Sequence, residues 1–212
     1  MDTADKSLAA DKIEWVKFSG ARWAPDSKGF YYSAYDAPKQ NAYSSKNEFQ
    51  KVYYHALGTP QSADRLIYED REHPLRYFSA WPSEDGKWLF VIASEGTSGT
   101  EVLYKRVSDP KFRVLLPGFD ADYSPVDCKD DRLYYATNRD ASNYALMKVD
   151  LNRPGMIETV IPESERNLLE GVGTAGGSLF AYYLQDAQSR IYQYDYAGKQ
   201  VREAALPAIG SG

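Results

Sequence analysis

The hydrophobic positions of the chain fall into short segments that are separated by polar turns. The clearest segments are rich in aromatic and β-branched residues and are bounded by turn-forming residues: 30–35, 88–93, 133–137 and 179–184. Such segments predict β-strands. Two further strand-like segments follow each of these, and a weaker one precedes it. Residues 163–169 alone have a helical pattern, and residues 12–18 are strand-like. We therefore expect an all-β chain.

The strands recur as one repeated unit. Equivalent strands begin at Phe30, Trp88, Leu133 and Leu179, at intervals of 58, 45 and 46 residues. The wider first interval contains a polar insertion, residues 36–49. A repeat of this length with four strands is typical of a β-propeller blade. The pattern predicts four consecutive four-stranded blades, either closed into a ring or forming part of a larger propeller.

The repeat also suggests limits for the parts of the chain. We expect residues 1–17 to be the end of a preceding blade or a linker, and residues 208–212 to be a linker or tag-like tail. Residues 18–207 are expected to form the propeller blades, with these approximate limits: 18–72, 76–118, 120–163 and 168–207. Apolar blade faces left uncovered would make the isolated chain open, marginally stable or self-associating.

Charge and hydropathy narrow the partners. The chain of 212 residues carries 30 acidic and 25 basic side chains, for a net charge of −5, and it has no basic cluster. Nucleic acid is therefore not an expected partner. Mean hydropathy is −0.57, and no apolar run approaches the length of a membrane span. We expect a soluble protein, and the sequence leaves its compartment open between cytoplasm and periplasm.

Few residues are available for catalytic or metal chemistry. The chain has one cysteine, Cys128, and two histidines, His55 and His73, which we interpret as a strand residue and a loop residue. The acidic cluster at positions 120, 122, 127, 130 and 131 lacks calcium-loop spacing and is interpreted as a solvated loop. No Gly-x-Ser-x-Gly elbow is present. We expect no catalytic residue, no metal and no cofactor in this chain.

Several sequence strings, taken in order, resemble the propeller of the prolyl oligopeptidase family. They are Ile-Glu-Trp-Val-Lys-Phe-Ser-Gly at 13–20, Gly-Phe-Tyr-Tyr-Ser-Ala-Tyr-Asp at 29–36, Tyr-Tyr-His-Ala-Leu-Gly-Thr at 53–59, Ser-Glu-Asp-Gly-Lys at 83–87 and Ala-Thr-Asn-Arg at 136–139. The resemblance implies a seven-bladed propeller over an α/β-hydrolase catalytic domain, with four of those blades in this chain. It also implies a parent enzyme that cleaves short peptides after proline, using a Ser/Asp/His triad that this chain lacks.

The same resemblance implies four residues on the substrate side of the propeller. Phe18 matches an aromatic position of the family, and Tyr77 stands where some members carry methionine. Ser94 and Thr97 stand where well-known members carry arginine and cysteine. Ordinary packing for the two aromatic residues, and plain loop chemistry for the other two, are the alternative interpretations.

Two other functions remain open from the sequence. One is a free-standing propeller that binds a protein partner through its loops. The other is the propeller of a related oligopeptidase that cuts after basic residues, because specificity there is set mainly by the catalytic domain. If the family resemblance holds, the partners are the parent's own catalytic domain and short proline-containing peptides.

Overall fold

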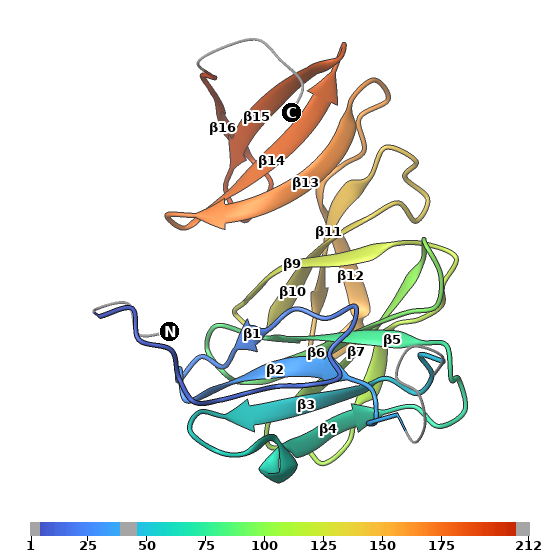
Figure 1. Cartoon of the computed structure of the whole chain (residues 1–212). Coiled ribbons are helices and arrows are strands. Elements are labelled where there is room, and N and C mark those ends of the chain that lie inside the picture. The colour runs from blue at the N-terminus through green and yellow to red at the C-terminus, as the bar shows by residue number, and fades with distance from the viewer. Residues whose placement is uncertain (1–4, 39–45, 207–212) are drawn as a thin grey trace. The chain divides into compact units, whose positions relative to one another are not determined.

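The computed structural model describes residues 5–38 and 46–206, and within them the regular structure is almost entirely β (Figure 1). One short 3-10 turn, η1 (Gln61–Ala63), is the exception. None of the described segments forms a helix long and apolar enough to span a membrane. The strands of the N-terminal half are β1 (Arg22–Trp23), β2 (Gly29–Ala34), β3 (Lys51–Ala56), β4 (Arg65–Glu69), β5 (Tyr77–Pro82), β6 (Trp88–Ser94), β7 (Thr100–Arg106) and β8 (Arg113–Leu116). Those of the C-terminal half are β9 (Tyr123–Lys129), β10 (Arg132–Thr137), β11 (Ala145–Asp150), β12 (Arg153–Ile161), β13 (Leu168–Ala175), β14 (Ser178–Gln185), β15 (Gln188–Tyr194) and β16 (Gln200–Ala204).

The chain divides into two compact units, Met1–Pro117 and Gly118–Gly212, called here the N-terminal and C-terminal units. Each unit contains two four-stranded antiparallel sheets whose neighbouring strands are consecutive in the sequence: β1–β4 and β5–β8 in the first unit, β9–β12 and β13–β16 in the second. The all-β class and the four four-stranded sheets are thus confirmed. The predicted tail at 208–212 lies outside the described residues.

Two local predictions were wrong. Residues 12–18 do not form a strand, because Trp15 and Phe18 adopt left-handed backbone angles, with φ of 60° and 53°. The segment instead makes hydrogen bonds to side chains. Residues 163–169 are not helical: an irregular connection leads directly into β13, which begins at Leu168. The amide of Asn143 donates to the side chain of Glu163, and this bond fixes the connection.

Each unit has its own core between its two sheets. In the N-terminal unit β1, β2 and β3 contact β5, and the buried ring of Phe78 on β5 packs edge-on against Tyr68 of β4. In the C-terminal unit Leu146, Leu179 and Ala181 belong to one buried cluster. Burial of such apolar side chains supplies the main stabilisation, about 25 cal/mol for each Å² removed from water.

Because neighbouring strands run antiparallel, the connections of each sheet gather at its two opposite ends. In the N-terminal unit we call one the entry rim, where the first strand of each sheet begins; it comprises residues 17–21, 35–38, 46–50, 70–76 and 94–99. The opposite end is the turn rim, made of the hairpins at 24–28, 57–64, 83–87 and 107–112. Residues distant in the sequence therefore meet on one rim.

Candidate functional site

Phe18 and Tyr77 form an aromatic pair on the entry rim. Their ring centroids lie 6.5 Å apart and the rings are tilted by 45°. Phe18 is 72% exposed, which is far more than a core phenylalanine would be, whereas Tyr77 is half-buried at the start of β5. The exposed face of Phe18 is available to an apolar ligand, and such a patch on a loop commonly marks a binding surface.

The loop that contains Ser94 and Thr97 lies beside this pair. Ser94 ends β6 and pairs with Tyr77 across the sheet. The hydroxyl of Tyr77 also donates a hydrogen bond to the carbonyl oxygen of Gly96. Thr97 is exposed in the same loop. The fold therefore brings Phe18, Tyr77 and the 94–97 loop together on one rim, although they are up to 79 residues apart in the sequence.

One charged residue of this rim, Arg76, was missed by the sequence analysis. Its guanidinium lies 3.2 Å from Asp70 and 3.6 Å from Glu95, which is part of the 94–97 loop. Burial alone would raise the pKa of Asp70, but hydrogen bonds from the Glu72 amide and the His73 ring hold that pKa below its ordinary value. The rim thus contains a cation beside the loop, and carboxylates balance it. Only its adjacency to Tyr77 could have signalled it.

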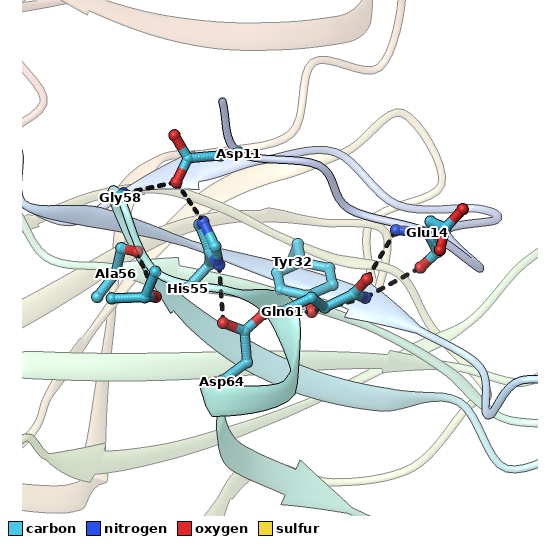
Figure 2. A network of polar contacts seen from close by, with 9 residues as sticks. Asp11, Glu14, Tyr32, His55, Ala56, Gly58, Gln61 and Asp64 are labelled. Atoms are coloured by element: carbon cyan, nitrogen blue, oxygen red, sulfur yellow. Dashed lines mark hydrogen bonds and ion pairs between the residues drawn. The ribbon is translucent and has the colours of Figure 1, made fainter. Parts of the chain in front are cut away.

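The segment that carries Phe18, residues 11–19, is called here the strap. Its upstream end is fixed to the turn rim by the network in Figure 2. Asp11 accepts hydrogen bonds from the Gly58 amide and from Nε2 of His55, the latter at 3.0 Å. The side chain of Gln61 holds the backbone of Glu14 twice, accepting from its amide at 2.9 Å and donating to its carbonyl oxygen at 3.1 Å.

His55 is the centre of this network and has no exposure to solvent. Its Nδ1 atom lies 2.7 Å from Asp64, which also accepts a hydrogen bond of 2.6 Å from the hydroxyl of Tyr32. Burial alone would lower the pKa of His55, but the hydrogen bonds to Asp11 and Asp64 outweigh burial and raise it. Two carboxylates facing both ring nitrogens favour the doubly protonated imidazolium.

The contacts of the two histidines and of the cysteine are the next feature of the described residues. Neither His55 nor His73 has a hydrogen bond to a serine or cysteine side chain among those found in the described residues. Cys128 is buried in the other unit. Across residues 5–38 and 46–206, no group of three or more His, Cys, Asp or Glu side chains is placed to hold a metal ion. His55 lies in β3 and His73 in the loop before β5, as the sequence predicted.

The acidic cluster of the C-terminal unit is more ordered than a solvated loop. Asp122 accepts a 2.6 Å hydrogen bond from the hydroxyl of Tyr144, and Asp127 accepts one from the hydroxyl of Tyr196. Both carboxylates thereby tie β9 to later strands and connections. The prediction of a solvated acidic loop was therefore wrong for these two members.

Comparisons with known proteins identify this architecture. The family model of the prolyl oligopeptidase N-terminal β-propeller domain matches residues 1–212. Prolyl endopeptidase from Elizabethkingia meningoseptica is 38% identical over 216 residues, which cover 100% of this chain and 30% of that protein. A solved prolyl endopeptidase, from a study of inter-domain dynamics in catalysis and specificity, superimposes with a TM-score of 0.86 at 33% identity. It covers 94% of this chain, which spans 30% of the solved chain.

A more distant likeness shows the fold alone. Oligopeptidase B from Leishmania major matches with a TM-score of 0.71 at 18% identity, covering 96% of this chain and 29% of that one. The much higher identity to prolyl endopeptidases separates the two kinds of relative. Four consecutive four-stranded sheets and the match along the whole length agree: the chain belongs to the prolyl oligopeptidase N-terminal β-propeller domain family.

Proposed function

We propose that this chain is the non-catalytic, substrate-gating portion of a serine peptidase that cleaves short peptides after proline. The observation that carries the proposal is the match of residues 1–212 to the propeller domain family, within relatives named prolyl endopeptidase of which the chain spans only 30%. The catalytic domain, an α/β-hydrolase with a Ser/Asp/His triad, and the remaining blades of a seven-bladed propeller would belong to the rest of such an enzyme.

Gating follows from the physics of a cap over an active site. A propeller above the nucleophile would exclude folded proteins and admit flexible short peptides. It would also keep bulk water out, which strengthens hydrogen bonds to the developing oxyanion. Opening and closing between the two domains would then control entry and product release.

Phe18, Tyr77, Ser94 and Thr97 would line the substrate side of this cap. Their support is the convergence of the aromatic pair and the 94–97 loop on the entry rim, together with the high exposure of Phe18. With serine and not arginine at position 94, recognition at this rim would depend on apolar contact with the peptide. The nearby guanidinium of Arg76 is already engaged by Asp70 and Glu95.

We also propose that the blades extend approximately over residues 18–72, 76–118, 120–163 and 168–207. The four observed sheets support these limits, since they span 22–69, 77–116, 123–161 and 168–204. Residues 1–17 would then connect to a preceding blade. The described part of this segment, which contains residues 11–17 of the strap, is held to the first sheet of the N-terminal unit through Asp11 and Glu14.

Peptidase assays test the proposed function. The full-length protein that contains this chain should cleave a chromogenic Gly-Pro peptide and leave matched Gly-Lys and Gly-Arg peptides intact, whereas the 212-residue chain alone should cleave none. Cleavage after lysine or arginine instead would support the oligopeptidase that acts after basic residues. A full-length protein without peptidase activity on any of the three would favour a free-standing binding propeller and overturn the proposal.

A further inference from the structure

A single buried side-chain amide joins the backbone next to Phe18 to the backbone next to Tyr77. Gln50 precedes β3 and is fully buried. Its Nε2 atom donates a 2.9 Å hydrogen bond to the carbonyl oxygen of Lys17, and its Oε1 atom accepts a 2.6 Å hydrogen bond from the amide of Phe78. Lys17 directly precedes Phe18, and Phe78 directly follows Tyr77. One side chain thus fixes the backbone next to both rings.

Ser33 of β2 forms a second bridge between the same two segments. Its amide donates a 2.8 Å hydrogen bond to the hydroxyl oxygen of Ser19, and its own hydroxyl donates a 2.7 Å hydrogen bond to the carbonyl oxygen of Phe78. Ser33 is also buried, at 1% exposure. The strap is therefore tied to β5 on both sides of Phe18.

We propose that Gln50, with Ser33 as a second support, is the positioning residue that holds Phe18 against Tyr77 for binding of the peptide substrate. The substrate part of this inference rests on the proposed function. A strap with two residues at left-handed φ keeps its shape only where surrounding contacts determine it. Phe18 is too exposed for packing to supply those contacts, so the two buried hydrogen-bond bridges supply them.

The geometry explains why a glutamine is required at position 50. The two bonded groups are a carbonyl oxygen and an amide N–H, so the bridge needs one donor and one acceptor on the same planar group. An apolar side chain of similar size would leave both backbone groups without their partner in a buried place, and such groups are costly. The strap and β5 would then separate or shift until water reached them.

The positioning role is tested on the 212-residue chain by aromatic NMR cross-relaxation between Phe18 and Tyr77. Gln50→Met should abolish the ring-to-ring cross-peak while the sheet signals of β5 and β6 persist. The matched control is Ser83→Ala, which removes a fully buried hydroxyl from the turn rim of the same unit and should leave the cross-peak intact. A cross-peak that survives in Gln50→Met overturns the proposal.

Gln50→Glu supplies a rescue experiment. A neutral carboxyl group can accept from the Phe78 amide and donate to the Lys17 carbonyl oxygen, as the amide does, whereas a carboxylate has no donor. Burial raises the pKa of a carboxyl group. The cross-peak should therefore be present in this variant at acidic pH and weaken as pH rises, while the unchanged chain shows no such loss. A pH-independent cross-peak in Gln50→Glu also contradicts the proposal.

Kinetics of the full-length protein separate this inference from the proposed function. Gln50→Met should raise KM by up to the five- to tenfold expected from removing the Phe18 ring, because Phe18 would no longer be held in place, for peptides that extend upstream of proline, with kcat little changed. If Gln50→Met loses the cross-peak but Phe18→Ala leaves KM unchanged, positioning is supported and the substrate role of the pair fails. If Phe18→Ala raises KM but Gln50→Met changes neither KM nor the cross-peak, the positioning role fails alone.

Discussion

Nδ1 of His55 lies 2.7 Å from Oδ1 of Asp64, and both side chains are almost completely excluded from solvent. The same imidazole bonds Asp11 through its other nitrogen. This buried arrangement connects the strap to β3 and to the loop that leads into β4. It explains how an irregular segment can be held against a β-sheet without forming a strand.

Removing the imidazole should destabilise the N-terminal unit. In His55→Ala the carboxylate of Asp64 stays buried and loses its charged partner, so we expect a loss of about 3 kcal/mol in the free energy of unfolding. Urea unfolding followed by tryptophan fluorescence measures this, because all four tryptophans lie in the N-terminal unit. The control, His73→Ala, removes a partly exposed imidazole and should cost less than about 1 kcal/mol. Equal losses in the two variants would contradict this account.

The same network should make stability depend on pH. The pKa of His55 is raised above its ordinary value of 6.5, so its contribution is complete below that value and is lost as pH rises through the folded-state pKa. The pKa of Asp11 is lowered from 3.8 by the His55 ring and the Gly58 amide, so its contribution is lost as pH falls. The groups that contact His55 are Asp11, Asp64 and the ring of Phe30, and the hydroxyl of Tyr32 donates to the same Asp64 carboxylate.

The stability difference between the unchanged chain and His55→Asn isolates this effect from other titrating groups. We expect the difference to be largest near pH 5–6 and to decline toward pH 9. Urea midpoints at several pH values measure it. A difference that stays constant from pH 6 to pH 9 would show that the imidazole does not carry a proton in the folded chain.

The strands could be predicted from the sequence because each is marked by its own short run of aromatic or β-branched residues and by the turn residues that bound it. The strand predicted at 88–93 is β6 (Trp88–Ser94), whose run of apolar residues indicates a strand without reference to any distant segment. The prediction of a strand at 12–18, within the strap, was wrong because the structure of this segment depends on distant residues. Its composition suits a strand, but its backbone groups bond the side chains of Gln50 and Gln61, which come 33 and 47 residues later.

The residues of the candidate site also differ in whether the sequence could indicate their role. Phe18 and Tyr77 were found only through resemblance to a family, because an exposed phenylalanine and a strand-end tyrosine have no distinctive local pattern. Gln50, His55 and Arg76 were not assigned a role in it. Their importance depends on partners up to 44 residues away in the sequence, and no spacing rule connects a glutamine to two backbone groups on other segments.

Truncation of Phe18 should weaken substrate binding and spare catalysis. In the full-length protein, Phe18→Ala removes an apolar surface that would contact the peptide, so KM for extended proline peptides should rise roughly five- to tenfold at nearly constant kcat. Steady-state kinetics with peptides of increasing length upstream of proline measure the effect. Leu57→Ala, which changes an exposed apolar side chain on the turn rim of the same unit, is the control. A fall in kcat without a change in KM would argue against a binding role.

Two glycines of the C-terminal unit separate backbone strain from steric conflict. Gly176 and Gly198 both have left-handed φ, of 54° and 86°. A Cβ at Gly176 would meet nothing within 4 Å, whereas one at Gly198 would lie 2.0 Å from the carbonyl oxygen of Val160. Gly198 closes the turn between β15 and β16, where its amide bonds Asp195, and it cannot move away without disturbing that turn.

We therefore expect Gly176→Ala to cost about 1 kcal/mol, the strain of left-handed backbone, and Gly198→Ala to cost about 3 kcal/mol because a clash with backbone is added. Urea unfolding followed by far-UV circular dichroism measures both. Tryptophan fluorescence is unsuitable here, since the C-terminal unit has no tryptophan. Equal losses of stability in the two variants would mean that the β15–β16 turn does not approach Val160 as closely as the structure shows. The contact between the β9–β12 sheet and the β13–β16 sheet would then need revision.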